Sequence, residues 1–503
     1  MTKKQAVFIL GAGPAGLAAA QELAAKKLFQ LNVLEKDDKV GGISRTESYK
    51  GYSFDIGGHR FFTKNNKIAA IWHETLGSEF LTVQRQSRIF YNHKFFQYPL
   101  KFWNTLLNLG VTESIRVSVS YVKAILFPFP QENSFEEWTI NRFGKRLFLL
   151  FFKSYTEKVW GIPCSCIQSD WAAQRIKGLS FASAVINAVF KTTKATSLID
   201  EFFYPRLGPG MMWEKFRERI TLEGGSVKVN ARAVALHHQQ GIIRELTFQK
   251  GGDRFTVAAD QVISSIPLDC LIAILDPPAP PKVIEAAKKI SYRAFIIVVL
   301  IVAKKEVFSD QWLYIHAPEV NVGRIQNFKN WSLAMVPDEN TTSLGMEYFC
   351  SETDEIWART DQDLVSLAAQ EIELLGLVQG FEIVDSYVMR QPKAYPVYDE
   401  GYKKHLEEIK KYLQQFENFQ TVGRNGMHRY NNMDHSMLSG IMAAENLMGS
   451  RHDIWEMKDP EEYLEENLID RAPGMLASFR RPVEKSLALA AVIVSISLLY
   501  CFW

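Results

Sequence analysis

Three glycines near the start of the chain place the strongest constraint on its fold. Residues 6–20 read AVFILGAGPAGLAAA, an apolar stretch followed by Gly11, Gly13 and Gly16 in the spacing G-x-G-x-x-G. This order predicts a buried strand, a tight turn and a helix. Gly11 permits the turn, Gly13 lets a phosphate group approach the backbone, and Gly16 lets the helix pack on the sheet. The free N–H groups of the helix N-terminus, which includes Ala15, would face the phosphate.

A second predicted strand follows the helix and ends in an acid. Residues 31–36 read LNVLEK, so Glu35 stands 19 residues after Gly16. A carboxylate at this place accepts hydrogen bonds from ribose hydroxyls. Together these features predict an α/β domain that binds a dinucleotide. No further G-x-G-x-x-G occurs, so we expect no dedicated NAD(P)H domain.

The continuation, KVGGISRTESYKGYSFDIGGHRFF (39–62), resembles the second glycine motif of a large flavoprotein superfamily. That superfamily includes amine oxidases, protoporphyrinogen oxidases, phytoene desaturases and UDP-galactopyranose mutases. The resemblance implies FAD as cofactor, held in a discontinuous Rossmann-like domain of the GR2 type. The resemblance implies that Gly41 and Gly42 extend the pyrophosphate cradle and that the backbone from Asp55 to His59 approaches the isoalloxazine.

Residues 421–437, TVGRNGMHRYNNMDHSM, resemble the third flavin segment, and within the superfamily they resemble UDP-galactopyranose mutases most. A strand would end near Gly423, and the helix that follows would point its N-terminus at the flavin pyrimidine. Asn432 departs from the pattern, because the mutases often carry an acid there. The residues that match are Gly423, Arg424, Tyr430, Met433 and Asp434. The cofactor-binding candidates are Gly11, Gly13, Ala15, Gly16, Glu35, Gly42, Ser44, Arg45, Gly58, Val234, Gly423, Arg424 and Met433, with His59 and Tyr430 near the flavin.

Three further stretches resemble the substrate site of the mutases. YTEKVWG (155–161) is similar to their lid, VGRIQNFKN (322–330) carries an arginine for the substrate phosphate, and KAYPVYD (393–399) carries a tyrosine beside it. The tryptophan, the arginine and the tyrosine could also be a core residue, a salt-bridge partner and a turn aromatic. The substrate-binding candidates are Tyr155, Trp160, Arg175, Arg324, Tyr395 and Tyr430.

The remaining patterns divide the chain into insertions within the FAD domain. Apolar residues at three- and four-residue spacing in 134–152 predict helices that cap the cofactor. The apolar run Ala294–Ala303 is about half a membrane span, which favours a core strand. The predicted parts are 1–89, 203–276 and 415–450 (FAD-binding domain), 90–202 (helical lid), 277–414 (mixed β substrate domain), 451–485 (connector) and 486–503 (transmembrane anchor).

Two classes of function follow from the resemblance. The first is an FAD-dependent pyranose–furanose mutase of a glycosyl phosphate, in which reduced flavin N5 is the nucleophile and no protein residue is a certain catalyst. Arg324, with Arg175 or Lys177, would bind the phosphate. The second is an FAD oxidase or desaturase of an apolar substrate, because YPRLGPGMMWEKF (204–216) resembles a stretch of protoporphyrinogen oxidases and carotenoid desaturases.

The end of the chain suggests which carrier the sugar would have. Residues 486–503, SLALAAVIVSISLLYCFW, contain no charge and would span about 27 Å as a helix. Arg480, Arg481 and Lys485 precede them, which predicts a single C-terminal membrane span with the body in the cytoplasm. A buried core helix is the alternative. An anchor favours a polyprenyl-phosphate-linked sugar over a nucleotide-linked sugar as substrate, with the lipid bilayer as partner.

Composition excludes several other classes. A formal net charge of +2 in 503 residues gives no field that would favour nucleic acid. The five cysteines form no CxxC pair, which argues against a disulfide framework and a structural zinc. No His and carboxylate spacing predicts a metal site, and no Ser-His-Asp order predicts a hydrolase.

Overall fold

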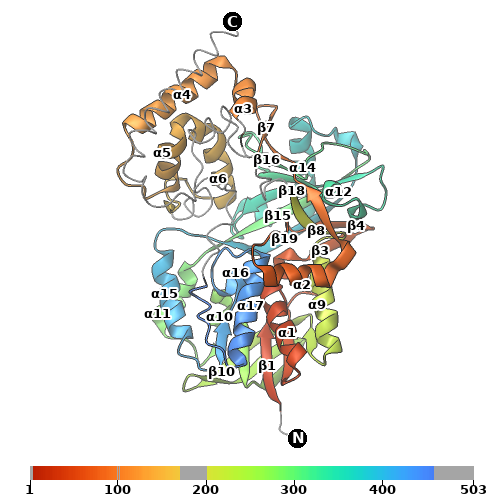
Figure 1. The fold of residues 1–503 in the computed structure, drawn as a ribbon, viewed down its shortest axis with the longest axis vertical. Coiled ribbons are helices and arrows are strands. Elements are labelled where there is room, and N and C mark those ends of the chain that lie inside the picture. Colours follow the sequence, from red (N-terminus) through yellow and green to blue (C-terminus); the bar gives the residue numbers. More distant parts are fainter. Residues whose placement is uncertain (1–3, 99, 101, 170–200, 458–503) are drawn as a thin grey trace.

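A five-stranded parallel sheet forms one end of the molecule, as the computed structural model of residues 4–98, 100, 102–169 and 201–457 shows (Figure 1). Alternate residues of the central strand β1 point to opposite faces: Val7 and Ile9 into one core, Phe8 and Leu10 into the other. The strand order is β20 (Phe419–Thr421), β13 (Gln261–Ser264), β1 (Gln5–Leu10), β2 (Phe29–Leu34) and β9 (Ser226–Lys228).

Helices cover one face of this sheet, and a second sheet covers the other. On the first face lie α1 (Pro14–Lys26), α2 (Asn66–Leu76), α9 (Gly210–Leu222) and α17 (Met433–Leu447). A Cβ at Gly440 of α17 would lie 2.0 Å from the carbonyl oxygen of Ala15, so only glycine lets these helices cross so closely. On the second face lie β10 (Ala231–Gln239), β11 (Ile242–Lys250), β12 (Asp253–Ala258), β14 (Leu275–Asp276), α10 (Leu268–Ala273), α11 (Pro281–Lys289) and α15 (Tyr402–Leu413).

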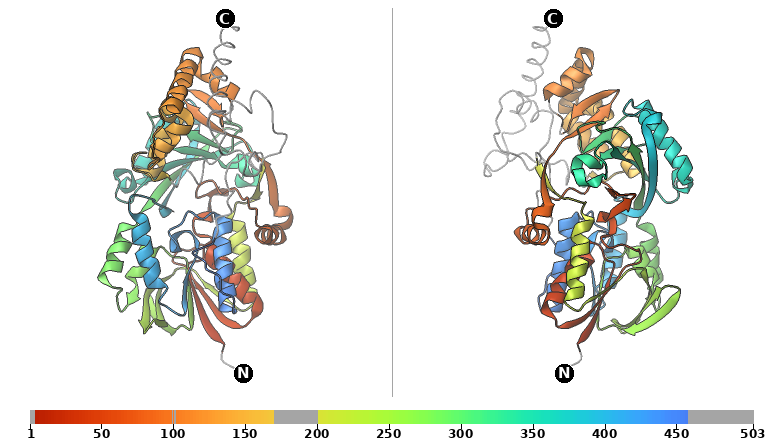
Figure 2. Two further views of the ribbon diagram at one scale, coloured as in Figure 1. Left: turned by 60° about the vertical axis from the view of Figure 1, so that its left-hand side comes forward. Right: turned by 90° about the vertical axis from the view of Figure 1, so that its right-hand side faces the viewer.

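A mixed seven-stranded sheet forms the middle of the molecule (Figure 2). The apolar run that predicted a core strand is its longest buried strand, β15, and that expectation is confirmed. Helix α14 (Asp361–Leu374) covers the outer face, so the inner face is left to line the interior. The strand order is β19 (Ile383–Pro396), β15 (Tyr292–Val302), β18 (Thr342–Cys350), β17 (Arg324–Asn327), β16 (Trp312–Ile315), β6 (Ser87–Tyr91) and β7 (Lys94–Gln97).

A helical unit lies at the end opposite the parallel sheet (Figure 2). Ser134 begins helix α5 with a capping box to Glu137, and Gly144, at φ 78°, kinks the helix. A π-helical turn, Phe148–Lys153, then leads into α6. The unit consists of α3 (Phe102–Leu109), α4 (Val111–Leu126), α5 (Phe135–Leu147) and α6 (Ser154–Trp160). The predicted boundary between residues 89 and 90 falls inside the β6–β7 hairpin, because that hairpin joins the seven-stranded sheet.

Short elements join these units. Two small sheets are antiparallel pairs: β3 with β4, which form a hairpin, and β5 with β8, which are far apart in the chain. They and the short helices are β3 (Thr46–Tyr49), β4 (Tyr52–Asp55), β5 (Phe80–Gln84), β8 (Glu201–Pro205), α12 (Phe328–Trp331), α13 (Glu355–Ala358) and α16 (Gly423–Gly426).

The predicted membrane localisation is corrected. Within the described ranges, every helix is too short or too polar to cross a bilayer. The segment on which that prediction rested, 486–503, lies outside the described residues, as do residues 458–485 of the predicted connector 451–485 and Arg175. The described residues therefore show the predicted α/β fold of the FAD-binding type but not the predicted transmembrane helix.

Candidate functional site

One large cavity, of about 1640 Å³, extends from the glycine turn after β1 to the inner face of the seven-stranded sheet. Its walls come from all three units of the molecule. Most of the predicted site residues line it: Gly11, Gly13, Ala15, Glu35, Gly42, Ser44, Arg45, Gly58, His59, Tyr155, Trp160, Arg324, Tyr395, Gly423, Arg424, Tyr430 and Met433.

The turn between β1 and α1 has the geometry that a pyrophosphate needs. Gly11 has a φ of +94° and donates its N–H to Leu34 O at 2.8 Å. A Cβ at Gly16 would lie 2.0 Å from Gly11 O, so this glycine is required for packing rather than for binding. Gly13 caps α1 without any side-chain hydrogen bond, and the nearest atom to its missing Cβ is Gly42 Cα at 3.8 Å. The first N–H groups of α1 are therefore available to phosphate oxygens.

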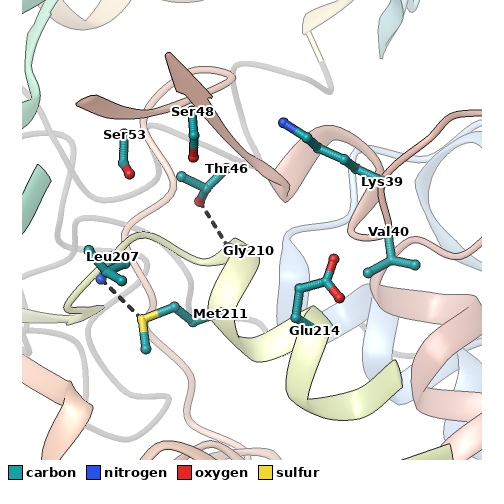
Figure 3. Close-up of a pocket in the computed structure, with 9 residues that line it drawn as sticks. All are labelled: Lys39, Val40, Thr46, Ser48, Ser53, Leu207, Gly210, Met211 and Glu214. Atoms are coloured by element: carbon teal, nitrogen blue, oxygen red, sulfur yellow. Dashed lines mark hydrogen bonds between the residues drawn. The ribbon is translucent and has the colours of Figure 1, made fainter. Parts of the chain in front are cut away.

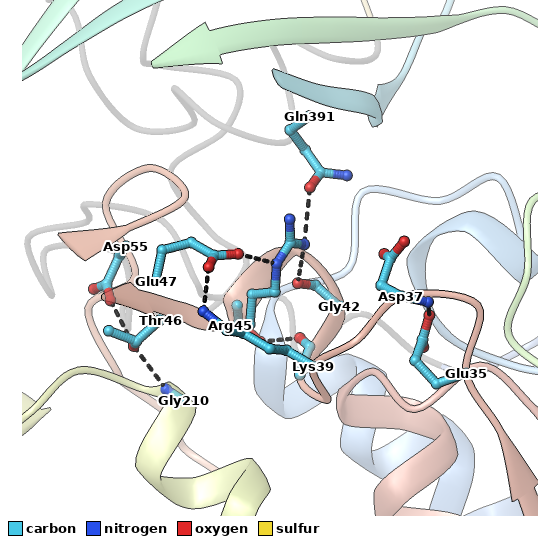
Figure 4. A network of polar contacts seen from close by, with 12 residues as sticks. Glu35, Asp37, Lys39, Gly42, Arg45, Thr46, Glu47, Asp55, Gly210 and Gln391 are labelled. Carbon is cyan, nitrogen blue, oxygen red and sulfur yellow. Dashed lines mark hydrogen bonds and ion pairs between the residues drawn. The ribbon is translucent and has the colours of Figure 1, made fainter. Parts of the chain in front are cut away.

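Glu35 closes the nucleotide end of the cavity (Figure 4). Its carboxylate accepts hydrogen bonds from Ala12 N at 2.8 Å and Asp37 N at 3.0 Å. Burial raises its pKa, while these two backbone donors oppose that rise. Because a carboxylate has about four acceptor positions, two remain for the ribose hydroxyls. Ala233 lines the same end, whereas Val234, one of the predicted cofactor-binding residues, is absent from the lining among the described residues.

Arg45 connects the second glycine segment to the seven-stranded sheet (Figure 4). Its guanidinium donates to Gly42 O at 2.9 Å and to Gln391 Oε1 at 3.1 Å, and its Nε donates to Glu47 at 2.7 Å. Ser44 donates its hydroxyl to Gly41 O at 3.0 Å, which fixes the same loop. These hydrogen bonds fix the conformation of the loop at residues 41–47. This loop lies next to the turn that would hold the pyrophosphate.

His59 lies where the resemblance predicts the isoalloxazine. Its Nε2 is 2.8 Å from Ile56 O, so Nε2 carries the proton. Burial, together with the charge of Arg424, lowers the pKa of His59 to about 4. The imidazole is therefore neutral at physiological pH.

The third flavin segment places an arginine over two tyrosines. Tyr395 and Tyr430 stack with centroids 5.5 Å apart and planes 11° apart. The Arg424 guanidinium lies 4.7 Å from the Tyr430 ring and 5.5 Å from the Tyr395 ring, and its Nε donates to Asn431 O at 2.9 Å. Burial raises the pKa of Tyr395 to about 12, so its hydroxyl keeps its proton and can act as a donor. Gly423, at φ +80°, donates to Ser439 Oγ and turns the chain into this position.

Arg324 lines the cavity but is already paired with an acid. Its Nε and Nη2 donate to Glu347 Oε2 at 2.7 and 2.6 Å, and Glu347 is fully buried. Gln326 donates to the other carboxylate oxygen at 2.9 Å. Both contacts of Arg324 use Nε and Nη2, which leaves Nη1 without a partner in the described part of the chain. Glu347 thus orients a guanidinium that still has donors for a ligand.

Glu347 was missed by the sequence analysis, although a signal was present. It is the only charged residue in LGMEYF (344–349), the apolar core of β18. A charge inside a buried strand needs a partner, because an unpaired buried carboxylate is costly. The partner could not be named, because β17 and β18 pair only through the tertiary register that sets Arg324 opposite Glu347.

The predicted lid residues have two different environments. Tyr155 faces the cavity, and the same helical face adds Phe151, Phe152 and Val159 to the lining. Trp160 is 4% exposed and packs in the core of the helical unit, although it also reaches the cavity wall. Most of the Trp160 side chain therefore packs as a core residue, which was the alternative reading of this tryptophan. Arg175 lies outside the described residues.

A second, smaller pocket of about 250 Å³ lies between the β3–β4 hairpin and the start of α9 (Figure 3). At its edge, Thr46 Oγ1 accepts from Gly210 N at 3.0 Å and donates to Asp55 at 2.8 Å. Tyr204 also donates to Asp55, at 2.5 Å. Burial raises the pKa of Asp55 to about 7. These hydrogen bonds fix the segment that precedes Gly57, a residue of the main cavity wall. We therefore assign the smaller pocket a structural role.

Solved structures of flavoenzymes share this architecture. A reduced UDP-galactopyranose mutase has a TM-score of 0.78 and 23% identity, covering 89% of this chain and 96% of that one. A protoporphyrinogen oxidase, so described, from Exiguobacterium sp. 255-15 has a TM-score of 0.67 and 16% identity, covering 89% and 99%. Putrescine oxidase with bound putrescine has a TM-score of 0.59 and 16% identity, covering 89% and 100%. At these identities the likeness shows the fold.

Sequence comparison identifies the family. A curated relative, an uncharacterised protein encoded in the nifH2 3′ region of Methanothermococcus thermolithotrophicus, is 42% identical over 60 residues, which is 12% of this chain and 57% of that protein. The family model of the flavin-containing amine oxidoreductases matches residues 14–448. The glycine cradle fits the pyrophosphate of FAD, and FAD as the predicted cofactor is confirmed. The chain belongs to the family of flavin-containing amine oxidoreductases.

Proposed function

We propose that this enzyme is a mutase that interconverts the pyranose and furanose forms of a sugar carried on phosphate. The observation that supports this most is the position of Arg324, which lines the cavity that also contains the cofactor cradle and whose Nη1 has no partner among the described residues. A phosphate at Arg324 would place its sugar between this arginine and the stacked pair Tyr395 and Tyr430. When bound and reduced, FAD would supply the nucleophile.

The residues around the sugar would act by position and charge. Glu347 holds the guanidinium of Arg324 by two contacts, which fixes the direction of the remaining donors. Tyr395 keeps its hydroxyl proton and is suited to donate to a phosphate oxygen. His59 is neutral, so it adds no charge to the cavity wall. The leaving phosphate would thus be stabilised by charge-assisted hydrogen bonds rather than by a protein acid.

The carrier of the sugar is a separate question. The apolar end of the sequence predicted a polyprenyl phosphate, but that segment lies outside the described residues. The solved mutase is named for UDP-galactopyranose, a nucleotide-linked sugar. We therefore take a nucleoside-diphosphate sugar as the first substrate to test and a polyprenyl-phosphate sugar as the second.

An oxidase of an apolar substrate is the second candidate. The side of the cavity near the helical unit is lined by Ile89, Leu100, Phe151 and Phe152, which would suit an apolar molecule. A structure described as a protoporphyrinogen oxidase shares the fold. In this alternative Arg324 and Glu347 would be a structural ion pair, and a substrate would need no phosphate.

Net redox change separates the two candidates. Dithionite-reduced enzyme is incubated anaerobically with UDP-galactopyranose, and in parallel with a polyprenyl-phosphate galactose, and products are identified by NMR. A mutase gives a furanose product over many turnovers without consuming reductant in proportion, and the oxidised enzyme gives none. A product with two fewer hydrogens than a supplied porphyrinogen or amine, formed with oxygen uptake, would instead establish the oxidase.

A further inference from the structure

Helix α6 forms a wall of the main cavity but belongs to the helical unit rather than to the sheet that it covers. Four of its seven residues line the cavity: Tyr155, Thr156, Val159 and Trp160. The apolar side chains of α6 pack in the core of the helical unit. Among the described residues, the two apolar clusters on the faces of the seven-stranded sheet contain none from α6. The joint between α6 and the sheet therefore depends on other contacts.

Lys158 supplies the first of these contacts, from α6 to the sheet. Its ammonium donates to three carbonyl oxygens at the turn between β16 and β17: Ala317 O at 2.7 Å, Val322 O at 3.3 Å and Ile315 O at 3.5 Å. An ammonium has three N–H donors, so this turn can satisfy all of them. Burial lowers the pKa of Lys158 to about 8, so the side chain is charged at pH 7.

The turn that Lys158 grips is itself fixed from the outer side of the sheet. Glu371 of α14, which is 5% exposed, accepts hydrogen bonds from Asn321 N at 2.6 Å and Val322 N at 3.0 Å. The same turn leads directly into Arg324, the first residue of β17. Lys158 therefore attaches α6 to a firm point of the sheet, beside the arginine of the cavity wall.

Arg293 of β15 makes the reverse contact, from the sheet to the end of α6. Its Nε donates to Val159 O at 3.2 Å and its Nη2 to Lys158 O at 3.4 Å, while Nη1 donates to Ser351 Oγ at 2.8 Å. The last carbonyls of a helix have no partner inside the helix, so a cation there satisfies them. Gly161 ends α6 at φ +69°, and a Cβ at this position would lie 2.3 Å from Arg293 Nη1. The glycine thus leaves room for the guanidinium.

We infer that Lys158 and Arg293 are positioning residues that fasten α6 across the cavity and so shield the bound flavin from solvent. Through α6 they also hold Tyr155 against the sheet. Tyr155 stacks on His316 with centroids 4.9 Å apart and planes 6° apart, and it meets Tyr314 edge-on at 5.4 Å. His316 lines the cavity as well, and its Nδ1 has no hydrogen-bond partner in the described part of the chain.

The composition of this joint determines how it should fail. It consists of a few charged hydrogen bonds and ring contacts rather than a shared apolar core, so removal of one cation should release α6 without unfolding either unit. The inference goes beyond the proposed function and does not depend on it, because a mutase and an oxidase would use the same cavity wall.

The test measures access to the flavin in the holoenzyme and needs no substrate. Lys158→Met removes the ammonium and keeps the apolar length of the side chain. Gly161→Ala displaces the Arg293 guanidinium without changing any charge. Quenching of flavin fluorescence by iodide, and by neutral acrylamide to separate access from charge, reports whether the wall has opened. Amide hydrogen exchange of residues 154–160 reports whether α6 has been released.

A second buried lysine of the same kind provides the matched control. Lys329 of α12 lies outside the cavity lining and also donates to three backbone carbonyls: Lys305 O at 2.8 Å, Thr341 O at 3.0 Å and Glu339 O. Lys329→Met should therefore lower the stability to urea by an amount similar to Lys158→Met, and it should change neither flavin quenching nor exchange in α6.

We expect Lys158→Met and Gly161→Ala to speed hydrogen exchange in α6 by about 10-fold or more and to raise both quenching constants at least about threefold, with flavin content unchanged. Values within about twofold of wild type in both variants would overturn the inference. An equal rise in Lys329→Met would overturn it too, because lost stability alone would then explain the effect. A rise in only one variant would remove the role of the other residue. If Lys158→Met does not fold or loses its flavin, Gly161→Ala decides in the same way.

Discussion

The two ends of the cavity are built by different means. At the cofactor end glycines 11, 13, 42 and 423 bring the main chain to the cavity wall, and the polar side chains nearby already have hydrogen-bond partners. At the substrate end the walls are side chains on adjacent strands of the seven-stranded sheet. There Arg324, Glu347 and His316 meet through strand register, and the imidazole has no partner among the described residues.

Because of this difference, the two ends of the cavity should respond differently to substitutions. A backbone site fails when a side chain occupies the space of the ligand or of a crossing element. A side-chain site fails when one member of a buried charged pair is removed and the other is left behind. The first kind of damage abolishes cofactor binding, and the second lowers the stability of the fold as well as ligand affinity.

The largest effect is expected from two glycines of the first turn. Gly13→Val should fold but bind no flavin, because its Cβ has room in the chain while the added methyl groups enter the cavity. Gly16→Val should lose the folded domain, because its Cβ would lie 2.0 Å from Gly11 O. Flavin absorbance per protein and circular dichroism measure the two outcomes. Equal flavin content in Gly13→Val and wild type would contradict the site.

The next effect concerns the ion pair. Arg324→Met should destabilise the protein by about 3–5 kcal/mol, because it leaves the buried carboxylate of Glu347 without its counter-charge. Arg324→Met combined with Glu347→Gln should recover most of that stability without recovering the binding of UDP. Denaturant unfolding and calorimetry report the two properties separately.

A matched control exists elsewhere in the same sheet. Arg88 pairs with the fully buried Asp310, with Nε 3.0 Å from both carboxylate oxygens, and lies outside the cavity lining. Arg88→Met should cost a similar amount of stability and leave UDP affinity unchanged. If Arg324→Met also left UDP affinity unchanged, Arg324 would be structural like Arg88.

The smallest effect depends on pH and concerns Asp55. The folded state holds its proton up to a pKa of about 7, whereas the unfolded chain releases it near 3.8. The free energy of unfolding contributed by Asp55 is therefore highest below pH 3.8, decreases as the pH rises from about 4 to about 7, and is constant above pH 7. Asp55→Asn removes the penalty, so it should be more stable than wild type by roughly 2–4 kcal/mol at pH 8 and by about nothing at pH 4. A gain independent of pH in urea unfolding would refute this assignment.

Much of the cofactor end could be predicted, because its signals are local. The order of β1, Gly11, Gly13 and α1 requires backbone angles and close approaches that few other residues allow, and Glu35 follows at a fixed distance along the chain. The substrate end was predicted only in part. Arg324 and Tyr395 came from resemblance, whereas Glu347, Tyr314 and His316 were not found.

The parallel nucleotide-binding unit, the buried strand β15 and the FAD cofactor could be predicted from local sequence, because each depends on residues near one another in the chain. Which side chains share the cavity depends on the tertiary fold. The register of β16, β17 and β18 brings residues 314, 324 and 347 onto one surface, and a shift of one residue would turn each of them to the opposite face. That register is set by the packing of the whole sheet, which no short stretch of the sequence contains.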